Sequence, residues 1–257
     1  MTAVRPIALV TGGMTRIGAI LSARLAAAGY DLALHKHRPV EPEPALAATM
    51  AAHGTAWAKF RADLSDAGDI DALVPAVAAH FGRAPTLLVN NASLFTESAW
   101  DTLTAADIDA AMRVNLSAPV MLAAALARAL PDGAHGCVVN ILDQRVAQPV
   151  PDQIAYTLSK QALWQATRTL AVALAPRVRV NAVAPGLTMP TADYGAAQWV
   201  RLAARMPLGA LSSADQIADA VLFLARANAT TGQTIFVDGG AHMVAMGRDF
   251  VHLDRPD

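Results

Sequence analysis

The sequence has little cysteine, little charge and no long apolar run. Cys137 is the one cysteine among 257 residues, which excludes a disulfide framework and a cluster of thiolate metal ligands. Charged residues make up 16% of the chain and nearly balance at a formal net charge of −1, so no basic excess exists to neutralise nucleic-acid phosphates. Because 54% of the residues are hydrophobic, intrinsic disorder is also excluded.

No uninterrupted apolar run of the sequence reaches the length of a membrane span. The longest apolar run, Ala118–Ala127, contains Pro119 and covers ten residues, whereas a span needs roughly 18–20. The N-terminus, MTAVRPIALVTGG, lacks the basic region and the apolar stretch of a signal peptide. We therefore expect a soluble, cytoplasmic protein that binds neither nucleic acid nor membrane.

Short apolar runs alternate with longer alanine-rich periodic stretches. The runs predict strands at Ile7–Thr11, Leu32–Lys36, Ala56–Ala62, Thr86–Asn90, Cys137–Leu142, Val178–Val183 and Thr234–Val237. The stretches predict helices at Ile17–Ala28, Pro44–His53, Ile70–Phe81, Ala105–Leu130, Ile154–Leu174 and Ala214–Ala227. This alternation predicts one α/β domain over residues 1–257, with a doubly wound parallel sheet of about seven strands and helices on both faces. Residues 187–211 interrupt the alternation and suit either a lid over a site or a surface loop.

The first predicted strand runs into a glycine-rich loop, TGGMTRIG at Thr11–Gly18, directly before a helix. Gly12 and Gly13 permit a tight turn, Gly18 permits close helix–sheet approach, and the helix N-terminus favours a phosphate. This context predicts a dinucleotide site, with a purely structural turn as the alternative. Arg16 stands where a glycine is usual and is either a forked phosphate partner or a solvated arginine.

The second predicted strand ends in basic residues, His35-Lys36-His37-Arg38. An NAD site needs an acid at this end, but the nearby acid, Asp31, lies at the start of the strand. Positive groups suit the 2′-phosphate, which favours NADP(H) over NAD(H); the alternative is that the histidines are ordinary surface residues. They lack companion ligands at metal-binding spacing, so we expect no metal site.

Tyr156 and Lys160 lie four residues apart in YTLSK, at the start of a predicted helix. This spacing places both side chains on one face. An ammonium near a phenol lowers the pKa of the phenol, so we expect Tyr156 to donate a proton near neutral pH. The spacing is common and does not by itself identify a site.

Further motifs follow in a fixed order. They are TGGMTRIG, Asp63-Leu64, NNAS at Asn90–Ser93, Asn115 in MRVNLSAPV, YTLSK, NAVAPG at Asn181–Gly186 and VDGG at Val237–Gly240. With this set, the chain resembles the short-chain dehydrogenase/reductases over nearly its whole length. The resemblance implies a Rossmann-type fold, a nicotinamide cofactor and a homotetramer.

Three departures narrow this resemblance. Asp143 lies 13 residues before the tyrosine, where the family generally has a serine. Arg16 replaces the middle glycine, and NNAG becomes NNAS followed by Leu94 and Phe95. Together with LHKHR at Leu34–Arg38, these features resemble the pteridine reductases and the bacterial dihydromonapterin reductases.

The resemblance implies roles for the matching residues. Asp143, Tyr156 and Lys160 would form the proton-donating group, and Asn115 would kink its helix and hold a water that leads to Lys160. Phe95 would stack on the pterin, Ser93 would contact the pterin or a cofactor phosphate, and Leu187 would line the substrate side. The implied cofactor-binding residues are Gly12, Arg16, Ile17, Gly18, His35, His37, Arg38, Asp63, Leu64, Asn91, Ala92, Tyr156, Lys160, Pro185, Gly186 and Thr188.

The carboxyl group of Asp143 suits an imine substrate. A serine hydroxyl donates to a carbonyl oxygen that becomes an alkoxide, whereas hydride addition to C=N leaves a nitrogen that needs a proton. An ionised Asp143 repels the charge that develops on a carbonyl, so ketone reduction should suffer. The alternative is that Asp143 only caps a loop.

The sequence thus predicts an NADPH-dependent reductase of a dihydropterin, such as dihydromonapterin or dihydrobiopterin. The alternatives are a broad carbonyl or 3-oxoacyl reductase and, in another class, a non-catalytic NADP-binding scaffold. Residues 241–257 extend beyond the usual family end. This tail either reaches a neighbouring subunit's site, through Arg248 and Phe250, or frays.

Overall fold

Seven parallel strands form the central sheet, in the order β3-β2-β1-β4-β5-β6-β7. The computed structural model describes residues 4–254. The strands are β1 (Ile7–Val10), β2 (Asp31–Lys36), β3 (Trp57–Arg61), β4 (Leu87–Asn90), β5 (Gly136–Ile141), β6 (Val178–Pro185) and β7 (Thr234–Val237). Every predicted strand is present, with shifts of at most two residues at its ends, and the predicted Rossmann-type parallel sheet is confirmed.

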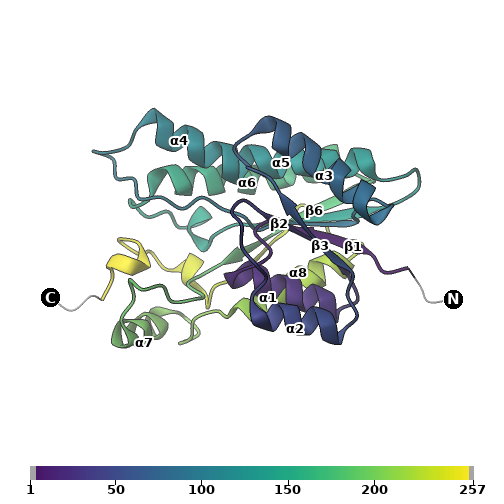
Figure 1. Cartoon of the computed structure of the whole chain (residues 1–257). Helices are drawn as coiled ribbons and strands as arrows, with labels where there is room; N and C mark the ends of the chain where they lie inside the picture. Colours follow the sequence, from purple (N-terminus) through teal and green to yellow (C-terminus); the bar gives the residue numbers. More distant parts are fainter. Residues whose placement is uncertain (1–3, 255–257) are drawn as a thin grey trace.

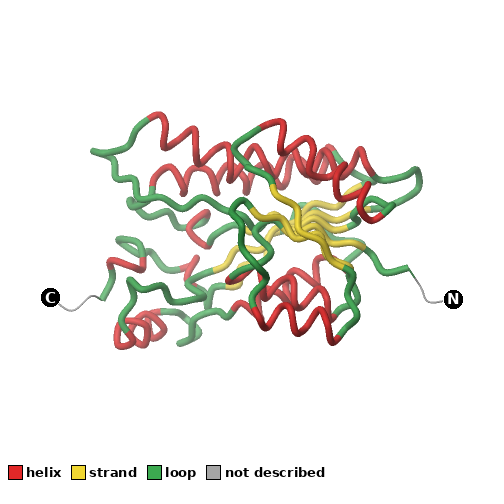
Figure 2. The backbone as a smooth tube through the Cα atoms, in the orientation of Figure 1, coloured by secondary structure: helices red, strands yellow, loops and turns green. Residues whose placement is uncertain are grey.

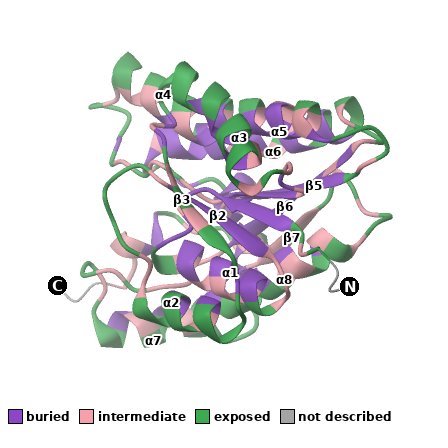
Figure 3. Cartoon of the chain, turned by 45° about the vertical axis from the view of Figure 1, so that its right-hand side comes forward, coloured by how far each residue is buried: buried purple, intermediate pink, exposed green. Residues whose placement is uncertain are grey.

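Helices cover both faces of the sheet (Figures 1 and 2). One layer holds α3 (Ala67–Phe81), α4 (Ala105–Met112), α5 (Ala118–Ala129) and α6 (Ile154–Ala173), and the other holds α1 (Arg16–Ala27), α2 (Pro44–Ala52) and α8 (Ala214–Arg226). Alternate strand residues enter different cores, because successive side chains point to opposite faces. In β1, Leu9 packs in the core that contains α3 and α5, and Val10 packs in the core that contains α1 and α8. The sheet is therefore buried on both sides (Figure 3).

The predicted helix Ala105–Leu130 is interrupted by one π-helical turn, Arg113–Ser117. The run Ala105–Ala129 is long and apolar enough to cross a membrane by length and composition alone, and 44% of its most apolar window is buried inside the molecule. Since α5 packs against α3, α6 and the sheet, we assign this run as a core helix of the fold.

The segment 187–211 is more regular than the sequence indicated. It contains a helix, α7 (Ala196–Arg205), that the sequence analysis missed. Leu202 of α7 is buried against Phe250 of the C-terminal tail, which also carries short turns at Ala241–Met243 and Phe250–His252. Up to Asp254 the tail is docked on its own chain, so fraying does not describe residues 241–254, and a contact of the tail with a neighbouring subunit stays a prediction. Residues 255–257 of the predicted extension lie outside the described residues.

Gly18 marks the closest approach of α1 to the loop before it. A Cβ added at Gly18 would lie 2.0 Å from the carbonyl oxygen of Gly12 and 2.8 Å from Nδ2 of Asn91. Gly12 has a left-handed φ of +61°, which favours glycine. The loop can therefore fold back onto the start of α1 only because both positions lack a side chain.

Gly18→Ala is expected to lower the free energy of unfolding by about 2 kcal/mol, because the backbone must shift to admit the methyl group. Gly68→Ala is the matched control, in the first turn of α3, where the nearest atom to an added Cβ is Oδ1 of Asp66 at 3.2 Å. The control should be neutral or stabilising by up to ~1 kcal/mol through helix propensity. Urea denaturation of both variants measures the difference, and equal destabilisation would contradict the close approach at Gly18.

Candidate active site

A cleft of about 390 Å³ lies at the carboxyl ends of the strands. Parallel α/β sheets bind ligands at this edge, because the loops after several strands meet there. Its lining includes Arg16 and Ile17 from the glycine loop, Phe95 after β4, Asp143 after β5, Gly186–Thr188 after β6, and Asp249–His252 from the tail. The cleft thus joins predicted cofactor residues, predicted substrate residues and the C-terminal tail.

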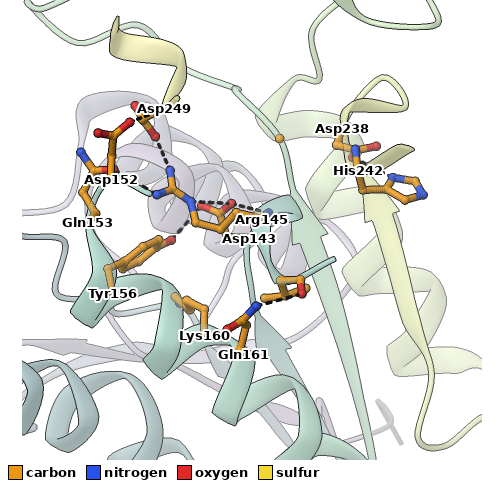
Figure 4. A network of polar contacts seen from close by, with 12 residues as sticks. Asp143, Arg145, Asp152, Gln153, Tyr156, Lys160, Gln161, Asp238, His242 and Asp249 are labelled. Atoms are coloured by element: carbon orange, nitrogen blue, oxygen red, sulfur yellow. Dashed lines mark hydrogen bonds and ion pairs between the residues drawn. The ribbon is translucent and has the colours of Figure 1, made fainter. Parts of the chain in front are cut away.

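Of the four predicted catalytic residues, Asp143 lines this cleft, and Tyr156 and Lys160 lie near it on α6 (Figure 4). The Tyr156 hydroxyl donates to Oδ2 of Asp143 at 2.9 Å. Lys160, one helical turn further along α6, donates from Nζ to the carbonyl of Ile141 at 2.8 Å. Oδ1 of Asp143 accepts the backbone N–H of Arg145 at 2.9 Å and caps a short turn. Asp143 therefore does both things that the sequence left open: one oxygen caps a loop and the other meets the phenol.

Burial controls the ionisation of Tyr156 and Lys160. Burial raises the pKa of Tyr156 well above its ordinary value, and the negative charge of Asp143 raises it further. Burial lowers the pKa of Lys160 to about 8, against the opposing effect of Asp143. The expectation that the ammonium lowers the pKa of the phenol is therefore wrong, since the enclosed phenol faces a carboxylate. Tyr156 stays protonated at neutral pH, in the form that can give up a proton.

Asn115 lies in the π-helical turn and holds the loop after β4. Its Nδ2 donates to the carbonyl of Leu94 at 2.8 Å and to Oγ of Ser159 at 3.0 Å. Its Oδ1 accepts from the backbone N–H of Leu94 at 2.8 Å and from Oγ of Ser93 at 3.1 Å. These four bonds use the capacity of the amide group. Asn115 thus ties α6 to the loop that carries Phe95, and its link to Lys160 through a water stays a prediction.

Phe95 forms an open edge of the cleft. Its ring lies edge-on to that of Tyr156, with 4.7 Å between the centroids, and 51% of the residue is exposed. An exposed aromatic face beside the phenol is available to a flat ring.

His35 lies beneath the glycine loop rather than in the cleft. The backbone N–H of Gly12 donates to Nδ1 at 3.2 Å, so Nε2 carries the proton and donates to the carbonyl of Ala62 at 3.1 Å. Burial also lowers the pKa of His35. His35 is therefore not an ordinary surface residue: its neutral ring supports the glycine loop from below, and its role in cofactor binding stays a prediction.

The other predicted basic residues lie at the surface. Arg16, His37 and Arg38 are exposed. The backbone N–H of Arg16 donates to Oε1 of Glu43 at 2.6 Å, and Nδ1 of His37 lies 3.6 Å from Oδ1 of Asp63. Of the remaining cofactor candidates, Leu64 and Pro185 are buried, and Asn91, Ala92, Gly186 and Thr188 are partly exposed. In residues 4–254, no group of three or more His, Cys, Asp or Glu side chains could hold a metal ion.

Three residues of the site carry no recognised sequence signal: Arg145, Gln153 and Asp249. Arg145 lies two residues after Asp143, and its Nε donates to Oδ1 of that residue at 3.3 Å. Its Nη2 donates to Oδ2 of Asp249 in the tail. The nearness of Arg145 to Asp143 in the sequence was a usable signal, but no local pattern indicates a partner 104 residues further on.

Known proteins resemble this chain over most of its length. A family model described as enoyl-(acyl carrier protein) reductase matches residues 13–242. Pteridine reductase 1 from Leishmania tarentolae is 33% identical over 280 residues, which cover 91% of this chain and 96% of that protein. A ketoacyl reductase attributed to the granaticin polyketide synthase of Streptomyces violaceoruber is 34% identical over 246 residues, with coverage of 93% and 97%.

A solved structure extends this likeness to the fold. FolM alternative dihydrofolate reductase 1 from Brucella canis, complexed with NADP, matches with a TM-score of 0.85 and 40% identity, covering 93% of this chain and 95% of that chain. The sheet order, the tyrosine–lysine pair on α6 and these matches agree. The chain therefore belongs to the short-chain dehydrogenase/reductase family of oxidoreductases.

Proposed function

We propose that this enzyme uses NADPH to reduce a dihydropterin to the tetrahydropterin. The 2.9 Å contact between the Tyr156 hydroxyl and Asp143 carries the proposal, because it sets a carboxylate beside the proton donor. The resemblance to pteridine reductase 1 and to FolM supports the substrate class. We also propose a cytoplasmic homotetramer, in which the segment 187–211 covers the substrate.

The residues around the glycine loop fit NADPH. Gly12 and Gly18 leave room that a Cβ would fill. Thr15 makes no side-chain cap on the first turn of α1, where the Arg16 N–H already donates to Glu43, so a phosphate would use the N–H groups that follow it. The exposed side chains of Arg16 and Arg38 supply positive charge for the phosphates. When bound, NADPH supplies the hydride that reduces the substrate carbon.

Tyr156 provides the proton that the reduced nitrogen needs. Its raised pKa keeps the phenol protonated at neutral pH. A phenolate left beside the Asp143 carboxylate would be repelled, so the phenol must regain a proton quickly. A proton that arrives on Asp143 can pass to Tyr156 along their hydrogen bond. Phe95 offers a ring for the pterin to stack on, beside this donor.

A second candidate function is carbonyl or 3-oxoacyl reduction, which the likeness to a ketoacyl reductase favours. The deciding experiment measures NADPH oxidation with dihydromonapterin, dihydrobiopterin, dihydrofolate, a simple ketone and a 3-oxoacyl thioester. We expect dihydropterins to show the highest kcat/KM and Tyr156→Phe to abolish turnover. A ketone or thioester turned over at higher kcat/KM would replace the proposal, and tight NADPH binding without turnover would indicate a scaffold.

Asp143→Ser tests the role of the carboxylate. Loss of an acid–base group costs typically 10²- to 10⁴-fold, so kcat/KM for the dihydropterin should fall by at least ~100-fold. Turnover of a simple ketone should not fall in parallel, because the serine hydroxyl can donate to a carbonyl oxygen. Steady-state kinetics with both substrates measures the two effects. Wild-type dihydropterin rates in this variant would exclude Asp143 from the chemistry.

Lys160→Met is expected to abolish activity and to stabilise the fold at pH 7. Lowering the pKa of Lys160 from 10.5 to about 8 corresponds to a cost of about 3 kcal/mol for the buried charge. The lost hydrogen bond to Ile141 offsets about 1–2 kcal/mol, so Tm should rise by about 2–5 °C.

The stability gain of Lys160→Met should depend on pH. The unfolded chain binds the Lys160 proton up to about pH 10.5 and the folded chain only up to about pH 8, so wild-type stability rises with pH between these values. The difference in Tm between Lys160→Met and the wild type should be largest below pH 8 and should shrink towards pH 10.5. Thermal melts across this range measure it, and a variant less stable than wild type at pH 7 would contradict the burial cost.

A further inference from the structure

The guanidinium of Arg145 binds three side chains from different parts of the chain (Figure 4). Nε donates to Oδ1 of Asp143 at 3.3 Å, Nη1 donates to Oε1 of Gln153 at 3.1 Å, and Nη2 donates to Oδ2 of Asp249. The Arg145 side chain is only 5% exposed, and its Cζ lies 5.2 Å from the centroid of the Tyr156 ring. Arg145 therefore joins the catalytic carboxylate to the C-terminal tail, beside the proton donor.

Asp249 is itself firmly held. Its backbone N–H donates to Oδ2 of Asp152 at 2.7 Å, and its Oδ1 accepts the backbone N–H of Val251 at 2.9 Å. The next residue, Phe250, is buried beside Leu202 of α7. Because the Asp249 side chain is also 5% exposed, its carboxylate has a fixed direction towards Arg145.

The charges explain why Arg145 needs its partner in the tail. One guanidinium lies between two carboxylates, and a buried guanidinium with an unpaired edge is costly. Asp249 satisfies the Nη2 edge, which leaves Nε directed at Asp143. Oδ1 of Asp143 is then held by both the backbone and the side chain of Arg145, so Oδ2 is directed at the Tyr156 hydroxyl.

We propose that Arg145 and Asp249 are positioning residues for Asp143, which makes the C-terminal segment 248–253 of the same chain part of the active site. The inference rests on the proposed function in giving Asp143 a role in proton transfer. It adds that the tail contributes by orienting the carboxylate through Arg145.

Asp249→Asn is the main test. Asparagine keeps the acceptor for the N–H of Val251 but removes the charge that holds Arg145. Misplacing a catalytic group by about 1 Å can cost ~100-fold, so we expect kcat to fall by about 10- to 100-fold, while KM for NADPH and for the dihydropterin changes by less than about threefold. Arg145→Lys should likewise lower kcat with little change in either KM, because an ammonium cannot bind both carboxylates through a planar fork.

Arg205→Gln is the matched control. It removes the exposed ion pair that joins α7 to Asp254 in the tail, with both N···O distances at 2.6 Å, and it does not touch the Arg145 cluster. Its kcat should remain within about twofold of wild type. Equal losses of kcat in Arg205→Gln and Asp249→Asn would show that the tail is merely structural, and wild-type kcat in Asp249→Asn would overturn the positioning role directly.

The kcat of each variant relative to the wild type is measured with whichever substrate of the panel the wild-type enzyme reduces. A wild-type enzyme that prefers a ketone overturns the dihydropterin proposal, and the ratios still decide the roles of Arg145 and Asp249. A protein that oxidises NADPH with no substrate of the panel overturns both proposals.

Discussion

The hydrogen bond from Tyr156 to Asp143 is the interaction on which the rest of this site depends. A serine at position 143 would be neutral and would need no compensation. A carboxylate in the wall of a cleft needs a cation, and Arg145 supplies it. A buried guanidinium needs a further acceptor, and Asp249 supplies that. Because Asp249 lies in the tail, the acid beside the phenol is linked through Arg145 to a segment that packs on α7.

This cluster is better explained by function than by stability. A buried ion-pair network is often no more stabilising than apolar side chains of the same size, because each charge loses its hydration. Lys160 shows the same conflict, since burial lowers its pKa to about 8 despite the opposing effect of Asp143. Charged groups kept in a buried wall at such a cost are typical of sites where proton transfer requires them.

The sequence predicted what depends on local pattern. Strands such as Cys137–Leu142 were recognised from a short apolar run, and the Tyr156–Asp143 contact followed from family spacing. Features set by the environment were not recognised. The neutral state of His35 depends on the N–H of Gly12, which folds back above it. The raised pKa of Tyr156 depends on enclosure, and the bond between Arg145 and Asp249 spans 104 residues, beyond the reach of any local pattern.

The position of the tail also bears on assembly. The sequence left open that the tail serves a neighbouring subunit, but Asp249 reaches Arg145 of its own chain. The cluster that orients Asp143 is therefore complete within residues 4–254 of a single copy. Formation of a homotetramer is then not required to bring Asp249 to this site. Assembly can act on the cluster by strengthening or loosening a tail that is already seated on α7.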